Sequence, residues 1–298
     1  MAEPGAAELR QQIARLADGW RTRQVGGVTV ASTPRLTAPL GGVAEPVVAL
    51  VAQGAKRAVL GNQVFDYAAG QFLVVTLDLP LTSSITVASA AEPFLGLSMP
   101  LDPAIIAELL IEADLPAQAA PPGPALSVSD ATAELIDAVV RLLRLAGTPH
   151  DQRILSPAVK REIHWRLLTG PQGGLVRQVG VAGSRIALVG RAIAWIRAHY
   201  DEPVRVDDLA AKVGLSVSSL NRHFRAATAM SPLQYQKQIR LQEARRLLLA
   251  GQADAASIGF AVGYESPSQF SREYARMYGQ PPLRDAVRLR GLGPLVAV

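Results

Sequence analysis

The chain has 298 residues, 49% hydrophobic and 18% charged, which is the composition of a globular protein large enough for about two domains. It contains no cysteine, which excludes disulfides, thiolate metal ligands and cysteine nucleophiles. No stretch of about 18 apolar residues occurs, and the acidic beginning lacks the basic start of a signal peptide. We therefore expect a cytoplasmic protein that does not enter a membrane.

The charge is distributed unevenly along the chain. Residues 1–180 contain 14 Lys or Arg and 16 Asp or Glu, whereas residues 181–298 contain 16 and 9. Fourteen of the 16 cations in the second part are arginines, whose planar fork of donors suits phosphate and guanine. This asymmetry indicates an anionic partner for the C-terminal part, although a solvated basic surface would give the same composition.

The first predicted elements are a short helix and then strands. Residues 7–18 carry Leu9, Ile13 and Leu16 at helical spacing. Between residues 26 and 99 short apolar runs alternate with turn residues, and the pair Gly61-Asn62 between two extended runs predicts a hairpin. The predicted strands cover residues 46–52, 57–60, 63–67, 72–77, 85–88 and 94–97. Many short strands at this spacing predict a small barrel or sandwich.

Helices follow the strand region. They are predicted over residues 102–114, 131–146 and 156–168, the first of them starting at Asp102-Pro103. We expect a loop over residues 116–124. The apolar stripes of the later helices would pack within their own domain or pair two chains. Glycines at 170–174 and 180–183 interrupt the helical pattern, which predicts one domain over residues 1–182 and another over 183–298.

The last third of the chain contains an internal repeat with a period of 50 residues. Both copies have the pattern Ser-x3-apolar-x-Arg-x-aromatic-x7-Pro, and a glycine precedes each of them. The matching pairs are Ser216/Ser266, Leu220/Phe270, Arg222/Arg272, Phe224/Tyr274 and Pro232/Pro282. Each copy predicts a helix-turn-helix: the glycine permits the turn, the serine caps the second helix, and the apolar and aromatic residues face the core.

A helix predicted over residues 232–250 separates the two copies. Two recognition helices on one rigid rod can enter successive turns of the major groove, about 34 Å apart. Arginine pairs with guanine in that groove, and asparagine or glutamine with adenine. The positions expected to face outward include Ser218, Asn221, Arg222, Arg225, Ser268, Gln269 and Arg272. A purely structural helical repeat is the alternative.

Residues 186–288 resemble the paired helix-turn-helix DNA-binding domain of the AraC/XylS family of transcriptional regulators. The resemblance rests on Leu209-Ala210, Gly214-Leu215-Ser216, Leu220 to Phe224, Ser231-Pro232, Arg240 to Leu248 and Val262 to Tyr274. It implies base contacts by Ser218, Asn221, Arg222, Ser268, Gln269 and Arg272, and we expect Arg225 to position the DNA backbone. Because Ser218 and Ser219 are small, the first helix would read fewer bases than in relatives with bulky side chains there.

The N-terminal part, over about residues 25–180, resembles the effector domain of one AraC subfamily. The resemblance rests on Gln53-Gly54, Lys56-Arg57, Gly61, Tyr67, Gly70-Gln71, Asp78-Leu79-Pro80, Glu92-Pro93 and Leu101-Asp102. It implies an α+β chain in which a cupin-like β-barrel with flanking, dimerising helices precedes an all-α domain with two helix-turn-helix motifs. We therefore expect a homodimer that binds double-stranded promoter DNA and a small-molecule effector, with RNA polymerase as a further partner.

The interior of such a barrel offers an apolar pocket with a few polar anchors. The candidate anchors are Gln53, Lys56, Arg57 and Tyr67, although Lys56 and Arg57 flank a hairpin and would then be surface charges. All four histidines follow residue 149, so we predict no metal site in the strand region, no cofactor and no enzymatic activity. Two alternatives remain: a barrel that binds no ligand and only dimerises or contacts polymerase, and a metabolite-binding enzyme with a DNA-binding tail.

Overall fold

The structure, a computed structural model, describes residues 4–17, 22–115, 123–251 and 254–290. Its strands are β1 (Thr22–Val25), β2 (Val28–Thr33), β3 (Leu40–Ala44), β4 (Val47–Gln53), β5 (Ala55–Leu60), β6 (Gln63–Ala68), β7 (Gln71–Val75), β8 (Leu79–Val87), β9 (Phe94–Pro100) and β10 (Leu126–Asp130). Its α-helices are α1 (Pro4–Ala17), α2 (Pro103–Glu112), α3 (Ala133–Arg144), α4 (Pro149–Thr169), α5 (Gly173–Gly180), α6 (Arg185–Ala198), α7 (Val206–Val213), α8 (Val217–Thr228), α9 (Pro232–Ala250), α10 (Ala255–Ala261), α11 (Pro267–Tyr278) and α12 (Pro282–Arg290).

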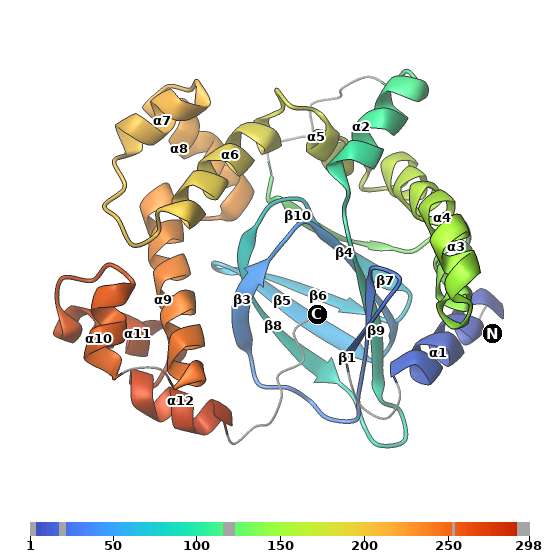
Figure 1. Ribbon diagram of the computed structural model, residues 1–298, viewed down its shortest axis with the longest axis horizontal. Coiled ribbons are helices and arrows are strands. Elements are labelled where there is room, and N and C mark those ends of the chain that lie inside the picture. Colours follow the sequence, from blue (N-terminus) through green and yellow to red (C-terminus); the bar gives the residue numbers. More distant parts are fainter. Residues whose placement is uncertain (1–3, 18–21, 116–122, 252–253, 291–298) are drawn as a thin grey trace.

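The strands form two antiparallel sheets at the centre of the molecule (Figure 1). One sheet has the order β1-β2-β9-β4-β7-β10 and the other the order β3-β8-β5-β6. The predicted hairpin joins β5 to β6, with Gly61 in the left-handed region at φ +61°. The predicted α+β fold with its cupin-like N-terminal part is confirmed. Its two sheets form a sandwich, because no hydrogen-bonded ladder among the described strands joins them into a closed barrel.

The glycines at 170–174 and 180–183 interrupt the helices as predicted, since α4 ends at Thr169 and the short helix α5 ends at Gly180. A Cβ atom at Gly180 would lie 2.7 Å from Ile106 Cγ2 and 2.9 Å from the backbone nitrogen of Ala107. This glycine therefore allows α5 to approach α2 closely, and α5 also ends at it. Residues 116–122 of the predicted loop lie outside the described residues. None of the described helices alone is long and apolar enough to cross a membrane, although α5 and α6, bent by 59°, satisfy the length and composition together.

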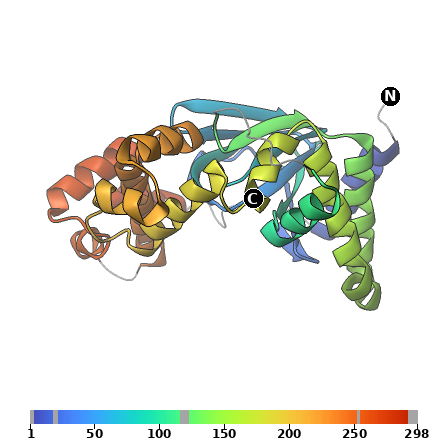
Figure 2. The ribbon, with the colours of Figure 1, turned by 90° about the horizontal axis from the view of Figure 1, so that it is seen from above.

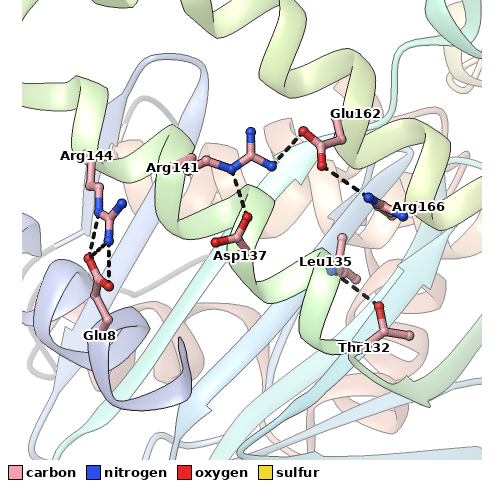
Figure 3. Close-up of polar contacts among 8 residues, drawn as sticks. All are labelled: Glu8, Thr132, Leu135, Asp137, Arg141, Arg144, Glu162 and Arg166. Carbon is pink, nitrogen blue, oxygen red and sulfur yellow. Dashed lines mark hydrogen bonds and ion pairs between the residues drawn. The ribbon is translucent and has the colours of Figure 1, made fainter. Parts of the chain in front are cut away.

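Helices α1, α3 and α4 form a layer at one end of the sandwich (Figures 1 and 2). The apolar stripe of α3, which includes Leu135 and Val139, is buried in one cluster with Ile13 of α1 and with side chains of the six-stranded sheet. Ion pairs fasten the outer surface of this layer: Arg144 contacts Glu8 at 2.6 Å, and Arg141 bridges Asp137 and Glu162 (Figure 3). The α3 stripe therefore packs within its own domain.

Helices α6 to α12 gather at the opposite end of the molecule (Figure 2). Their residues belong to two buried clusters. Phe224 and Tyr235 share one cluster with Leu79 and Leu81 of the four-stranded sheet, whereas a separate cluster, which includes Phe270, serves α10 and α11. The predicted domain boundary falls immediately before Ser184, the N-cap of α6, and it stays a prediction.

Candidate nucleic-acid interface and effector cavity

The first helix-turn-helix consists of α7 and α8. Gly214 ends α7 in the left-handed region at φ +73°, where other residues would be strained. The Ser216 hydroxyl accepts a hydrogen bond from the Ser219 backbone N–H at 3.2 Å and so caps α8. Leu220 and Phe224 are fully buried, and the opposite face of α8 is left to solvent.

The second helix-turn-helix, α10 and α11, repeats these devices 50 residues later. Gly263 takes φ +86° in the turn, and the Ser266 hydroxyl accepts a hydrogen bond from the Gln269 N–H at 3.4 Å. Pro267 occupies the first turn of α11, and Phe270 and Tyr274 are fully buried. The predicted sequence repeat is therefore a repeat of structure as well.

Helix α9 connects the two motifs as the sequence predicts. It begins with a capping box, in which Ser231 and Gln234 exchange side-chain and backbone hydrogen bonds. Its 19 residues give a length of about 28 Å at the usual rise of an α-helix. This length is comparable to one turn of B-form DNA.

Most of the predicted contact residues lie on the exposed faces of α8 and α11. Ser218, Arg222 and Arg225 are exposed on α8, and Ser268, Gln269 and Arg272 on α11. Asn221 is half-buried, and its amide nitrogen donates a hydrogen bond to the Val217 carbonyl at 3.1 Å. This bond occupies one of the donors that adenine recognition would use.

The arginines of residues 183–290 fall into two groups. Some form ion pairs with other residues of the protein: Arg245 pairs with Asp285 at 2.8 Å, and Arg197 pairs with Asp78. The exposed arginines whose guanidinium groups form no ion pair or hydrogen bond with any described residue are Arg222, Arg225, Arg272, Arg276 and Arg284. Arg276 and Arg284 are not among the predicted contacts. The position of Arg276 one helical turn after Arg272 is the signal that would have indicated it.

His223 lies beside Arg222 on α8 and is half-buried. Burial, together with the nearby positive charges of Arg222 and Arg185, lowers the pKa of His223 below its ordinary value. The imidazole is therefore neutral at neutral pH, so the positive charge of this surface comes from its arginines.

A cavity of about 380 Å³ lies between the two sheets. Most of its lining is apolar, and strand β3 forms one of its sides. Its polar groups include Lys56, which is only 5% exposed, and the equally buried Tyr67. Burial lowers the pKa of Lys56 to about 8 and raises the pKa of Tyr67 above its ordinary value. At neutral pH the cavity thus presents an ammonium group and a neutral phenol within a mostly apolar lining, which also includes Glu45 and the hydroxyl groups of Thr29, Ser83 and Ser98.

Of the four predicted ligand anchors, the structure brings Lys56 and Tyr67 into this cavity. Arg57 points outward from the same strand, is exposed, and pairs with Asp66 on the neighbouring strand at 2.6 Å, as the alternation of side chains along a strand requires. Gln53 lies outside the lining, where its amide nitrogen donates a hydrogen bond to the Pro93 carbonyl at 2.8 Å. Lys56 is thus buried, against the alternative that it is a surface charge.

Both parts of the chain match known protein families. Residues 24–175 match the model of the AraC-type transcriptional regulator N-terminus, and residues 209–285 match a helix-turn-helix domain. The chain therefore belongs to the AraC/XylS family of transcriptional regulators.

Relatives with known names share part of the chain. It is 26% identical over 150 residues to the HTH-type transcriptional regulator ArgR of Pseudomonas aeruginosa, which is 50% of this chain and 46% of that protein. It is 30% identical over 105 residues to the HTH-type transcriptional activator RhaS of Pectobacterium carotovorum, which is 35% of this chain and 38% of that protein. The matches thus span about half or less of the length of these relatives.

Solved structures show the same fold over most of the chain. ToxT from Vibrio cholerae has a TM-score of 0.58 at 8% identity, covering 87% of this chain and 97% of that one. A second ToxT structure, bound to an unsaturated fatty acid, has a TM-score of 0.55 at 12% identity and covers 92% of this chain and 100% of that one. At such identities the likeness establishes the arrangement of the elements.

Proposed function

We propose that the protein is a sequence-specific regulator of transcription, which binds double-stranded DNA through both helix-turn-helix motifs and is controlled by a small molecule held between its sheets. The observation that supports DNA binding most directly is the pair of arginines Arg222 and Arg272. These arginines occupy matching positions of the repeat, are exposed, and have no ion pair with any described residue. They stand on helices that are joined by α9, whose length of about 28 Å is comparable to one turn of B-form DNA.

The remaining exposed arginines fit a different role in the same complex. Arg225, Arg276 and Arg284 carry their charge to the surface of α8, α11 and α12. Arginines of this kind bind phosphates, hold the register of the protein on the duplex and make the affinity depend on salt. In this proposal Arg222 and Arg272 specify the sequence, and the other three supply orientation and sequence-independent affinity.

The direct test is selection of bound duplexes from a randomised pool by the full-length protein, with and without a panel of small carboxylic acids. We expect enrichment of a two-part motif whose halves lie about 10 base pairs apart from centre to centre. Binding without a shared motif under all of these conditions would contradict specific recognition. A one-part motif would restrict recognition to a single helix-turn-helix.

The chemistry of the cavity supports one class of effector, an anionic molecule with a large apolar part. The apolar lining would accept the hydrocarbon, and the buried ammonium of Lys56 and the phenol of Tyr67 would face the anion. Structures of ToxT have been solved with an unsaturated fatty acid and with (E)-4-(8-methylnaphthalen-1-yl)but-3-enoic acid, which are acids of this description. They support the proposed class for this chain.

Replacing Lys56 by methionine is expected to weaken binding of such an acid about 10- to 100-fold, the usual contribution of one charge-assisted hydrogen bond. In the unaltered protein, affinity is expected to fall as the pH rises above about 8, because the pKa of Lys56 lies there and only the protonated amine attracts an anion. Titration calorimetry with carboxylic acids and the matching alcohols measures both effects.

Arg57→Met is the matched control, because it removes an equal charge one residue away on the outer face of β5. Loss of acid binding in Arg57→Met with retention in Lys56→Met would place the site outside the cavity. If no acid or alcohol changes the melting temperature of the unaltered protein, the alternative of a ligand-free dimerising or polymerase-contacting domain is favoured.

Homodimerisation, contact with RNA polymerase, a cytoplasmic location and the absence of catalysis complete the proposal. The matched relatives are named as a transcriptional regulator and a transcriptional activator, which supports a role in transcription. Because the stripe of α3 is buried, a dimer would use another surface, and α4 exposes Ile154 and Leu155. Light scattering on Ile154→Glu and on the unaltered protein tests this surface, and an unchanged mass would exclude it.

A further inference from the structure

Arg240 lies on α9 between the two helix-turn-helix motifs and donates hydrogen bonds to the segment that leads into the first and to the turn of the second. Its Nε binds the Tyr200 carbonyl at 2.6 Å, and its Nη2 binds the carbonyls of Asp201 and Glu202 at 3.2 and 3.0 Å. Its Nη1 binds the Gly263 carbonyl at 2.7 Å. The first three carbonyls belong to the segment that leads into α7, and the fourth belongs to the turn of the second motif. We call Arg240 and these four carbonyls the inter-motif clasp.

The two segments that Arg240 joins also touch one another directly. Gly263 has φ +86°, and a Cβ atom on it would lie 2.2 Å from the Asp201 carbonyl oxygen. Glycine is therefore required at this position for the sake of the contact as well as for the turn. On the preceding turn of α9, Gln236 Nε2 donates a further hydrogen bond to the Tyr200 carbonyl at 2.9 Å.

Side chains beside the clasp fasten the second recognition helix to α9. Lys237 Nζ lies 2.9 Å from Glu273 Oε1 on α11. The Tyr264 hydroxyl donates a hydrogen bond to Glu273 Oε2 at 2.9 Å, and the Arg240 guanidinium lies 5.9 Å from the centre of the Tyr264 ring. The orientation of α11 is thus tied to the same turn of α9 that holds the first motif.

We propose that Arg240 is a positioning residue, which fixes the distance and rotation between the two recognition helices and thereby selects the spacing of the two half-sites. The proposal rests on the proposed DNA-binding function. Without the clasp, each motif would be attached to α9 mainly through the end of that helix and its own buried cluster. Arginine suits the role because its planar fork reaches several carbonyls at once, whereas lysine offers a single point of charge.

The distance between the recognition helices can be measured without DNA. Because the chain contains no cysteine, the double variant Ser218→Cys/Ser268→Cys carries spin labels only at two exposed positions, one on each helix. Pulsed electron paramagnetic resonance is expected to give a narrow distance distribution. Adding Arg240→Gln is expected to broaden or shift it, and Arg240→Lys is expected not to restore it. Arg246→Gln, which removes an exposed arginine paired with Glu243 on the same helix, is expected to leave it unchanged.

A glycine pair tests the same contact from the other side. Gly263→Ala places a Cβ against Asp201, whereas Gly214→Ala adds comparable backbone strain at φ +73° with nothing within 4 Å of the new atom. We expect the first to change the distance distribution and the second to preserve it, with circular dichroism confirming that both are folded. An unchanged distribution in both Arg240→Gln and Gly263→Ala would overturn the proposal, and so would equal broadening in the controls.

The consequence for DNA is tested with duplexes that carry the two selected half-sites at successive spacings. Linked binding units gain affinity only when both sites match their separation, so the unaltered protein is expected to lose at least about tenfold when the spacing changes by a few base pairs. Arg240→Gln is expected to flatten this profile, with unchanged affinity for single half-sites. An equal loss of affinity at every spacing would contradict the positioning role of Arg240. Failure of the unaltered protein to bind any duplex would contradict the DNA-binding function, and the spin-label result would still decide the role of Arg240.

Discussion

The double variant Arg222→Ala/Arg272→Ala is expected to lose sequence-specific DNA binding and to keep its fold. A bidentate arginine–guanine contact contributes about 1–3 kcal/mol of discrimination, and effects at distant sites add, so the specific affinity should fall by about 30- to 20,000-fold. Both guanidinium groups are exposed and have no ion pair with any described residue. Their removal therefore leaves no buried charge behind, and the melting temperature should hardly change.

Fluorescence anisotropy with the selected duplex and a scrambled duplex, at two salt concentrations, measures this loss. Arg153→Ala is the matched control, because Arg153 is exposed on α4 at the opposite end of the molecule. Arg276→Ala should behave differently from both, lowering the affinity for the two duplexes alike and reducing the salt dependence. Retention of specific binding by the double variant would refute the assignment of α8 and α11 as recognition helices.

Replacing Asp285 by alanine is expected to destabilise the second motif by about 3–5 kcal/mol, the usual cost of breaking a buried ion pair on one side. Asp285 is fully buried and accepts hydrogen bonds from Arg245 Nε at 2.8 Å, Arg288 Nη2 at 2.7 Å and the Tyr274 hydroxyl at 3.0 Å. Arg245 is only 5% exposed. The variant would leave this guanidinium without its partner in the interior.

Urea denaturation followed by circular dichroism measures the loss, and the double variant Arg245→Met/Asp285→Leu is expected to recover much of it. Asp137→Ala, which breaks the exposed pair with Arg141 (Figure 3), should have little effect.

Burial alone would raise the pKa of Asp285, but the hydrogen bonds from Arg245 and Arg288 hold it below its ordinary value of 3.8. The contribution of the network is therefore present above that pH and is lost as the pH falls below it. Equal stability of Asp285→Ala and Asp137→Ala would contradict this account.

The helix-turn-helix motifs could be predicted because their signals are local. A capping serine, a glycine in the turn and two core residues one helical turn apart specify each motif within a short stretch of sequence. Strand β3 carries no such signal, since its two glycines suggest a turn, and its pairing with β8 determines its conformation. The same limit applies to β10, whose partner β7 lies about 50 residues earlier in the chain.

The sequence also leaves the inner face of β5 ambiguous. Both alternating sets contain one cation and apolar residues: Lys56 with Ala58 and Leu60, and Arg57 with Val59. Only the pairing with β8 and β6 determines that Lys56 faces the cavity. Arg240, Arg245 and Arg246 present a similar problem, because neighbouring arginines on one helix differ only in what the tertiary structure places beside them.

The two buried clusters of the DNA-binding part meet within α9, since one ends at Ile239 and the other begins at Leu241. Residues that share a buried cluster tend to unfold together, whether or not they are neighbours in the chain. We therefore expect the first motif to unfold together with the sandwich and the second motif to open by itself at a lower free energy. Hydrogen exchange is expected to show strong protection of amides up to about residue 240 and weaker protection after it. This division lies well beyond the glycines at 170–174 and 180–183, where the charge of the chain changes. A ligand bound between the sheets would consequently stabilise the recognition helix of the first motif by mass action, and the stability of the other would depend on its own core and on DNA.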